Sequence, residues 1–138
     1  NKSSYNKKFK YIFNGVKEKI IGDFGLSGGG AAGLEIDSVN KNLDSLKNLN
    51  ILASSNKHTD IYLMTPEDLL DPAPGLGGTE SELIKSDLVF YETTNNGAVF
   101  SVGSIAWAGS MAWNNYKNNI SKITKNVLDR FLKKKRFK

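Results

Sequence analysis

The sequence predicts an α/β fold in which helices pack against a small sheet, and three observations carry this prediction. Residues 50–54 form a short apolar run between polar residues, which is typical of a buried strand. Residues 87–93 and 98–104 are predicted to be two strands, joined through an Asn-Asn-Gly turn that strongly favours a hairpin. Apolar residues recur at helical spacing along residues 116–131. Strands and helices alternate, but the strands are too few for a complete doubly wound sheet, so the chain is expected to be such a layered domain or part of one.

The first half of the chain contributes a helix and two shorter elements. We expect a helix over residues 11–21, because its apolar residues recur at helical spacing and Gly22 ends the pattern. Residues 61–64 are either a second short strand or an extended loop. A short helix is predicted to begin at Thr65, which can cap it, with Pro66 in the first helical position. A proline- and glycine-rich loop over residues 71–81 follows and ends that helix.

In the second half, the strand predicted over residues 98–104 is almost continuously apolar. Such a run indicates cover on both faces and therefore a central place in the sheet. Trp107 and Trp113 flank Gly109-Ser110 in the loop expected next, where they either line a small apolar pocket or pack in the core. The last helix is expected to run for about five turns, with one apolar stripe and lysines near its end. The stripe consists of Tyr116, Ile120, Ile123, Val127 and Phe131.

The net charge of +5 is concentrated at the two ends of the chain. Residues 1–10 carry four lysines and residues 133–138 carry five basic groups, with no acid in either segment, so the remaining sequence is net negative. We therefore predict basic tails over residues 1–10 and 134–138, flanking a domain segment over residues 11–133. Solvated tails explain this pattern better than nucleic-acid binding, which needs a positive patch on the folded body. No nucleic-acid partner is expected.

Composition also limits the cellular location and the kind of chain. No apolar stretch approaches the length of about 18 residues that a membrane span needs, and the first residues are polar and basic rather than a signal peptide. The chain has no cysteine, which excludes disulfides and thiol catalysis and is compatible with the cytoplasm. A single domain of 138 residues beginning at Asn1 is expected to be a segment of a longer protein. No membrane partner is expected.

The segment with the strongest indication of a functional site is the glycine-rich run over residues 24–37. Glycine allows backbone amides to approach a ligand closely, so Gly29 and Gly30 are candidate walls of a pocket and Glu35 a candidate acid on its rim. Asp37 is more consistent with capping a turn. The run also fits Gly-x-Gly-x-x-Gly, but it lacks the preceding strand and the later acid of a dinucleotide site, and no Lys-Ser/Thr follows for a phosphate loop.

Few other residues offer site chemistry. His58 is the sole histidine and follows the first predicted strand, where either a structural role or catalysis is possible. One histidine and no cysteine exclude a zinc site of the usual kind, and Tyr62 and Tyr91 are weak candidates for iron ligands. Glu92, at a strand end, is expected to be structural. No Gly-x-Ser-x-Gly elbow exists, which argues against a serine triad.

Three segments, residues 24–37, 51–60 and 87–131, resemble the C-terminal end of the large (beta) subunit in the N,N-dimethylformamidase family. The resemblance includes Gly-Gly-Gly-Ala-Ala-Gly-Leu-Glu at residues 28–35. Residues 54–58 are similar to a Ser-Ser-Glu-Gly-His pattern of that family, with Asn56 and Lys57 in place of its acid and its glycine.

The resemblance implies a fold and a chemistry. The fold would be the last portion of a domain similar to class I glutamine amidotransferases, which gives a partial three-layer sheet. The family hydrolyses small N-substituted formamides at a mononuclear iron held by two tyrosines and a carboxylate, ligands that we expect upstream of this segment, with none in this chain. Glu35 would be the acid–base group. Gly29, Gly30, His58 and Trp107 would form the substrate pocket.

The same resemblance implies partners. A small-molecule amide, the remainder of the large subunit and a small subunit are expected, with an oligomer when the protein is full length, and the isolated segment is expected to be inactive. The alternative is a non-catalytic module of the same fold that binds a small ligand or forms a subunit interface.

Overall fold

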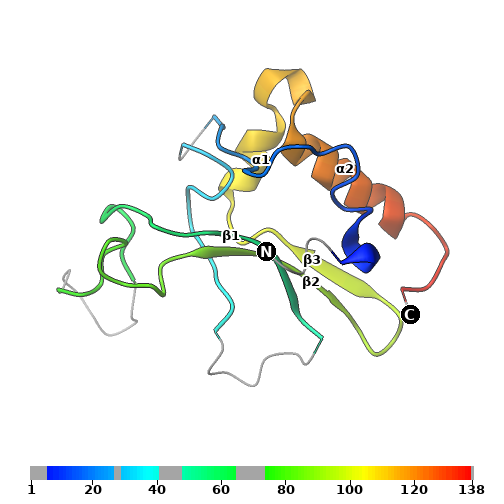
Figure 1. The fold of residues 1–138 in the computed structure, drawn as a ribbon, viewed down its shortest axis with the longest axis horizontal. Helices are drawn as coiled ribbons and strands as arrows, with labels where there is room; N and C mark the ends of the chain where they lie inside the picture. The colour runs from blue at the N-terminus through cyan, green and yellow to red at the C-terminus, as the bar shows by residue number, and fades with distance from the viewer. Residues whose placement is uncertain (1–5, 27–28, 41–47, 65–73, 138) are drawn as a thin grey trace.

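The computed structural model describes residues 6–26, 29–40, 48–64 and 74–137, and its centre is a three-stranded antiparallel sheet (Figure 1). Both α-helices and the N-terminal 3-10 turn lie on one side of this sheet in Figure 1. The elements in chain order are η2 (Lys7–Phe9), β1 (Asn50–Ser55), β2 (Ser86–Glu92), β3 (Ala98–Ser101), α1 (Ala106–Met111), η3 (Trp113–Tyr116) and α2 (Asn119–Phe131). The chain is thus a mixed helix and strand structure, as predicted.

The sheet has the strand order β1-β2-β3, so β2 is its central strand within the described residues. Ser55 at the end of β1 lies opposite Ser86 at the start of β2, and Glu92 at the end of β2 lies opposite Ala98 at the start of β3. The end of β1, the start of β2 and the end of β3 therefore share one end of the sheet. That end carries the candidate site.

The prediction that the 98–104 strand is central is wrong for the described chain. β3 ends at Ser101 and pairs with β2, and its apolar residues are half-buried, whereas β2 is buried at nearly every position. The cover for the apolar run of β3 comes from one side, where the Phe100 ring meets the Trp107 indole at a centroid distance of 6.3 Å. An apolar run shows burial, but it does not show how many strands flank it.

The hairpin between β2 and β3 is confirmed. Its turn places Asn96 at φ +64°, and the Thr93 amide donates to the Gly97 carbonyl at 2.9 Å. The Gly97 amide in turn donates to the Thr93 hydroxyl at 3.0 Å. Asparagine and glycine are the residues that tolerate such left-handed turn geometry best, which is why the turn was predictable.

The last helix is confirmed, but it begins later than predicted. Asn114, Asn115 and Tyr116 have φ between +50° and +63°, so α2 starts at Asn119 and Tyr116 is exposed. The Asn118 side chain caps the helix by accepting from the Ser121 amide at 2.9 Å. The face that α2 buries carries Ile120, Ile123 and Val127. The apolar stripe was right in its core positions and wrong at its first.

The helix expected over residues 11–21 is absent from the structure. Successive turns replace it, with three-residue hydrogen bonds such as the one from the Ile12 amide to the Phe9 carbonyl at 3.0 Å, and Gly15 has φ +76°. The Asn126 side chain of α2 donates to the carbonyls of Ile12 and Asn14 at 3.0 and 2.9 Å. A side chain remote in sequence thus satisfies carbonyls that a helix would have used itself.

The loop predicted around Gly109-Ser110 is in fact helical. α1 covers residues 106–111 and buries Trp107, whose indole nitrogen donates to the Thr124 hydroxyl of α2 at 3.0 Å. Trp113 follows α1, is 43% exposed and stacks on Phe24 of the glycine-rich run. Glycine inside a short helix is tolerated here because packing on α2 and the sheet stabilises the helix.

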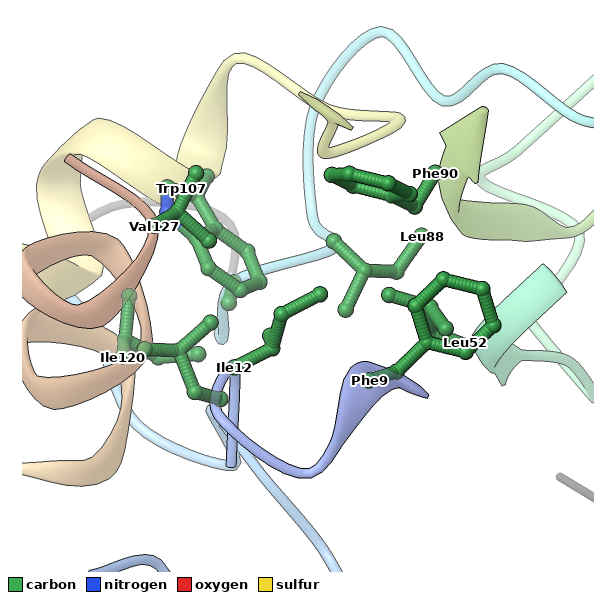
Figure 2. Packing of buried hydrophobic residues seen from close by; sticks show 10 residues of the cluster. Phe9, Ile12, Leu52, Leu88, Phe90, Trp107, Ile120 and Val127 are labelled. Carbon is green, nitrogen blue, oxygen red and sulfur yellow. The ribbon is translucent and has the colours of Figure 1, made fainter. Parts of the chain in front are cut away.

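The hydrophobic core lies between the sheet and the helices (Figure 2). It combines residues from along the whole chain: Phe9, Ile12, Ala31, Leu52, Leu88, Phe90, Trp107, Ile120, Ile123 and Val127. Phe9 is 1% exposed, so residues 6–10 differ from the solvated tail expected there. The core begins before residue 11, because burial of the Phe9 ring is favourable and the neighbouring lysines stay exposed to solvent.

Between the strands, residues 61–64 are an extended loop with a single bridge from Leu63 to Gly77. The helix predicted to begin at Thr65 and the first part of the loop predicted over residues 71–81 lie outside the described residues. None of the helices in the described ranges has the length and hydrophobicity that crossing a membrane requires.

Candidate functional site

The last residue of the glycine-rich run, Asp37, is hydrogen-bonded to residues at the end of the sheet. The Asp37 amide donates to the Gly103 carbonyl at 2.8 Å, and the Asp37 carbonyl accepts from the Asp87 amide at 2.9 Å. Gly103 has φ +67°, and a Cβ there would lie 2.7 Å from both the Asp87 carbonyl and the Ser86 hydroxyl. A close approach of three backbones therefore requires glycine at this position.

Glu35 lies on the exposed rim of this arrangement, between two anchors. On one side, Ser104 binds Leu34. The Ser104 hydroxyl donates to the Leu34 carbonyl at 2.5 Å and accepts a hydrogen bond from the Leu34 amide at 3.3 Å. On the other side the Asp37 amide is bound to Gly103. Glu35 itself has φ +44°, a conformation that is uncommon for a residue with a side chain and is found often at functional sites.

The two predicted glycine walls occupy different surroundings. Gly30 is buried, and a Cβ there would lie 2.8 Å from the Gly22 carbonyl, which also accepts from the Ala31 amide at 2.8 Å. Gly29 is exposed with φ +73° and has open space where a side chain would project. Gly30 is therefore needed for packing of the loop, while Gly29 is needed for its turn.

A small hollow of about 70 Å³ lies against the glycine-rich run. Trp107, Ala31 and Ala32 give it apolar walls, and serine side chains from the strand ends give it polar ones. Its full lining is Ile21, Ala31, Ala32, Ala53, Ser54, Ser55, Ser86, Leu88, Val102 and Trp107. Because a water molecule takes up about 30 Å³, the hollow has room for a group of very few heavy atoms.

His58 lies beyond the end of β1 and is linked to both the hollow and the glycine-rich run. Its Nε2 atom is 3.1 Å from the hydroxyl of Ser55, which lines the hollow. Its ring centroid lies 4.7 Å from that of Tyr62, and the Tyr62 hydroxyl donates to the Gly33 carbonyl. These contacts give His58 a structural role at the site and leave catalysis as a prediction.

Gly29, Gly30 and Glu35 belong to the glycine-rich run itself, and the other two predicted site residues do not share a cavity. Trp107 lines the hollow, whereas His58 lines a separate open groove with Lys57 and Glu80. Thr79 also lines that groove, and its hydroxyl and amide donate to the Asp60 carboxylate at 2.5 and 2.9 Å, which lowers the pKa of Asp60.

Sequence reasoning missed Asp87 as a part of the site. This carboxylate is 3% exposed, and it accepts from the Ser54 hydroxyl at 2.6 Å and the Val39 amide at 2.9 Å, with the Lys85 ammonium 3.5 Å away. It thereby orients Ser54 at the hollow. The available signal was an acid directly before the apolar residues Leu88, Val89 and Phe90, since a buried charge needs partners.

The donor groups of the described chain do not form an iron site of the kind that the resemblance implies. No cluster of three or more His, Asp or Glu residues suited to a metal ion occurs among the residues that the structure describes. Tyr62 is engaged with Gly33, Tyr91 belongs to β2, and Glu92 accepts from the Lys8 ammonium at 2.7 Å. Glu92 is therefore structural, as predicted, through its ion pair with Lys8.

Comparison with known proteins identifies the family of this chain. Residues 2–119 match the family described as N,N-dimethylformamidase beta subunit-like, C-terminal. The chain therefore belongs to this family. Two relatives, both called N,N-dimethylformamidase beta subunit, come from Paracoccus aminophilus and from an Alcaligenes species, and each is 42% identical over 131 residues. The match covers 94% of this chain but 17% of each relative, so the chain spans about a sixth of their length.

Proposed function

We propose that this chain is the C-terminal part of an amide hydrolase that acts on small N-substituted formamides. The family membership and the 42% identity to two N,N-dimethylformamidase beta subunits support this proposal. The structural observation that carries it is Glu35, held in a left-handed conformation on an exposed rim between the Leu34 and Asp37 anchors. Strained, well-anchored backbone of this kind is characteristic of functional positions.

The proposed task of Glu35 is proton transfer. Hydrolysis of an amide needs a group that takes a proton from the attacking water and returns one to the departing amine nitrogen, and a carboxylate can do both. The Glu35 residue is exposed in this chain, so it is accessible to a substrate and to the remaining catalytic groups. The iron and its ligands would come from the part of the protein outside this segment.

The hollow beside Trp107 suits the proposed substrate class. Its volume of about 70 Å³ and its alanine and tryptophan walls favour small apolar groups such as N-methyl groups. The Ser54 and Ser55 hydroxyls on its wall can bind a polar atom of the same molecule. Gly30 stabilises the loop that forms this wall, because its backbone packs closely on Gly22.

We also propose the wider setting that these features imply. The sheet and its helices would be completed by the rest of the large subunit into a layered fold similar to class I glutamine amidotransferases. A small subunit, an oligomeric assembly and a cytoplasmic location are part of the same proposal.

A segment exchange tests the function. This chain would replace the matching segment of the Paracoccus aminophilus beta subunit, and amine release from N,N-dimethylformamide and bound iron would be measured. We expect the chimera to bind iron and to retain turnover. If the folded, iron-loaded chimera shows no turnover while the unexchanged subunit is active, the proposed catalytic function of this chain is wrong. That result would favour a non-catalytic module of the same fold, which binds a small ligand or forms a subunit interface.

A further inference from the structure

The two basic segments of the sequence lie together at the hairpin end of the sheet, away from the candidate site. Phe9 and Phe137 both pack on Phe90, with ring centroids 5.5 and 5.9 Å apart. The Phe137 amide also reaches the Asn96 carbonyl of the hairpin turn at 3.5 Å. Figure 1 shows η2 beside the C-terminal end of the chain. Lysines more than a hundred positions apart therefore share one surface.

The C-terminal part of this surface is pinned to the folded body. The Arg130 guanidinium donates to the carbonyls of Lys135 and Arg136, both at 2.9 Å. The same guanidinium lies 3.8 Å from the centroid of the Phe137 ring. The side chains of residues 133–136 are exposed while their backbone is held in place, so their charges are arranged before any partner arrives.

Little negative charge offsets these cations. Across residues 7–10 and 125–136, nine basic side chains face two nearby carboxylates, Glu92 and Asp129. Both carboxylates are already paired, Glu92 with Lys8 at 2.7 Å and Asp129 with Lys125 at 2.5 Å. Lys7, Lys10 and residues 133–136 make no ion pair within the described chain, and their summed field attracts anions.

Exposed leucines accompany the cations. Leu128 near the end of α2 and Leu132, the residue directly after it, are 56% and 82% exposed and immediately precede the lysine run. Most of the basic side chains are lysines, and the Arg130 guanidinium is already hydrogen-bonded to two backbone carbonyls. Nucleic-acid surfaces favour free arginines and stacking aromatics, whereas apolar side chains among lysines suit a polypeptide that carries both carboxylates and apolar groups.

We propose that this basic surface, made of Lys7, Lys10, residues 133–136, Leu128 and Leu132, binds an acidic polypeptide segment that also contains apolar side chains. The carboxylates of that segment pair with the lysines, and its apolar side chains cover the two leucines. This role goes beyond the proposed hydrolase function, since it uses the end of the sheet opposite Glu35.

Binding of labelled peptides to the full chain tests the proposal. The probes are a fluorescein-labelled peptide of repeated Glu-Glu-Leu units, an all-Glu peptide of the same length and an oligothymidylate of matched charge. The variant is the triple change Lys133→Glu, Lys134→Glu and Lys135→Glu. The control reverses the charge of three other exposed lysines, Lys17, Lys19 and Lys117, none of which belongs to the basic surface.

We expect the triple variant to bind the Glu-Glu-Leu peptide about tenfold or more weakly, with a smaller loss for glutamine at the same positions and little change for the control. The same binding should weaken as salt is added. Near-ultraviolet circular dichroism verifies the fold of each variant. An equal loss in the control, or no loss in a folded triple variant, would overturn the proposal. Tighter binding of oligothymidylate would overturn the proposal in favour of a nucleic-acid partner. Equal binding of the all-Glu peptide would overturn the proposed contact of apolar side chains with Leu128 and Leu132.

Discussion

Two charged residues near the candidate site adopt the left-handed backbone conformation, Glu35 at φ +44° and Lys57 at φ +59°. A side chain in this region crowds the following carbonyl, at a cost of about 1–2 kcal/mol per residue. Lys57 stands where the similar family pattern has glycine, so the structure explains why glycine suits that position. The lysine occupies the same turn with a strained backbone.

Replacing Lys57 by glycine should therefore stabilise the chain. Relief of the backbone strain should exceed the greater freedom that glycine has in the unfolded state, for a gain of about 0.5–1 kcal/mol in the free energy of unfolding. Urea denaturation measures this gain. Lys57→Ala is the matched control, because it removes the charge and keeps the Cβ atom. A gain of equal size in Lys57→Ala would assign the effect to charge rather than to backbone conformation.

Glu35→Gln tests the proposed acid–base role in a complete enzyme that carries this segment. The amide is nearly isosteric, so folding and bound iron should stay unchanged while turnover falls by about two to four orders of magnitude. Asp37→Asn is the matched control, since Asp37 contributes backbone hydrogen bonds and has an exposed side chain. Near-normal turnover in Glu35→Gln would make the acid structural, and loss of iron would make it a ligand.

The Tyr11 hydroxyl gives a prediction about pH. It is buried without a hydrogen-bond partner among the described residues, and this burial raises its pKa to about 12. Because the unfolded chain loses this proton near pH 10 and the folded chain keeps it, stability should fall as pH rises from about 10 to 12.

Tyr11→Phe should remove the part of this alkaline loss that belongs to Tyr11. At neutral pH the variant should be equally stable or more stable, by up to about 1 kcal/mol, because it no longer buries an unpaired hydroxyl. Thermal unfolding at pH 7 and between pH 10 and 12 measures both effects. If the stability of Tyr11→Phe falls between pH 10 and 12 as steeply as that of the wild type, other groups cause the loss.

At the scale of elements, helix boundaries depend on single asparagines. Asn118 accepts from the Ser121 amide, and its side-chain nitrogen donates to the carbonyls of Met111 and Trp113 at 3.0 and 2.6 Å. One side chain therefore starts α2 and fixes the connection from α1. Asn114 and Asn115, with φ of +50° and +52°, make the sharp turn that precedes it.

Asn118→Ala should cost about 1–2 kcal/mol of stability, since it removes the cap and leaves two carbonyls without their donor. Asn118→Asp is the informative control: it keeps the capping oxygen, loses the donor and should fall between wild type and alanine. Urea unfolding ranks the three chains. A cost for aspartate equal to that for alanine would show that the donor bonds, rather than the cap, start the helix.

Elements were predictable where local chemistry decides them. The Asn-Asn-Gly turn, the apolar run of β1 and the buried stripe of α2 each follow from residues that are close in sequence. The failures occurred where distant residues decide. Asn126 satisfies the Ile12 and Asn14 carbonyls, so the apolar spacing of residues 11–21 forms turns instead of a helix. Packing of Trp107 under α2 made α1 helical in spite of its glycine.

At the scale of the whole molecule, the isolated 138-residue chain should not hydrolyse N,N-dimethylformamide. The described residues bring no metal-ligand cluster to Glu35, and one acid–base group contributes only about 10²–10⁴-fold. Amine release by the purified chain, with and without added iron, measures this. The chimera described above is the positive control. Robust turnover with stoichiometric metal in the isolated chain would show that the site is complete within it.

The sequence by itself determined the family to which the chain belongs and the hairpin between β2 and β3, because the glycine-rich run and the Asn-Asn-Gly turn are local features. The acid–base role of Glu35 stays a prediction. Tertiary structure alone decided that Ser104 and Gly103 anchor the loop that carries Glu35, and that Asp87 orients Ser54. It also decided that the two basic segments meet at Phe90. The physical reason is that hydrogen-bond partners and packing surfaces far apart in the chain are chosen by the free energy of the whole core, which no local pattern records.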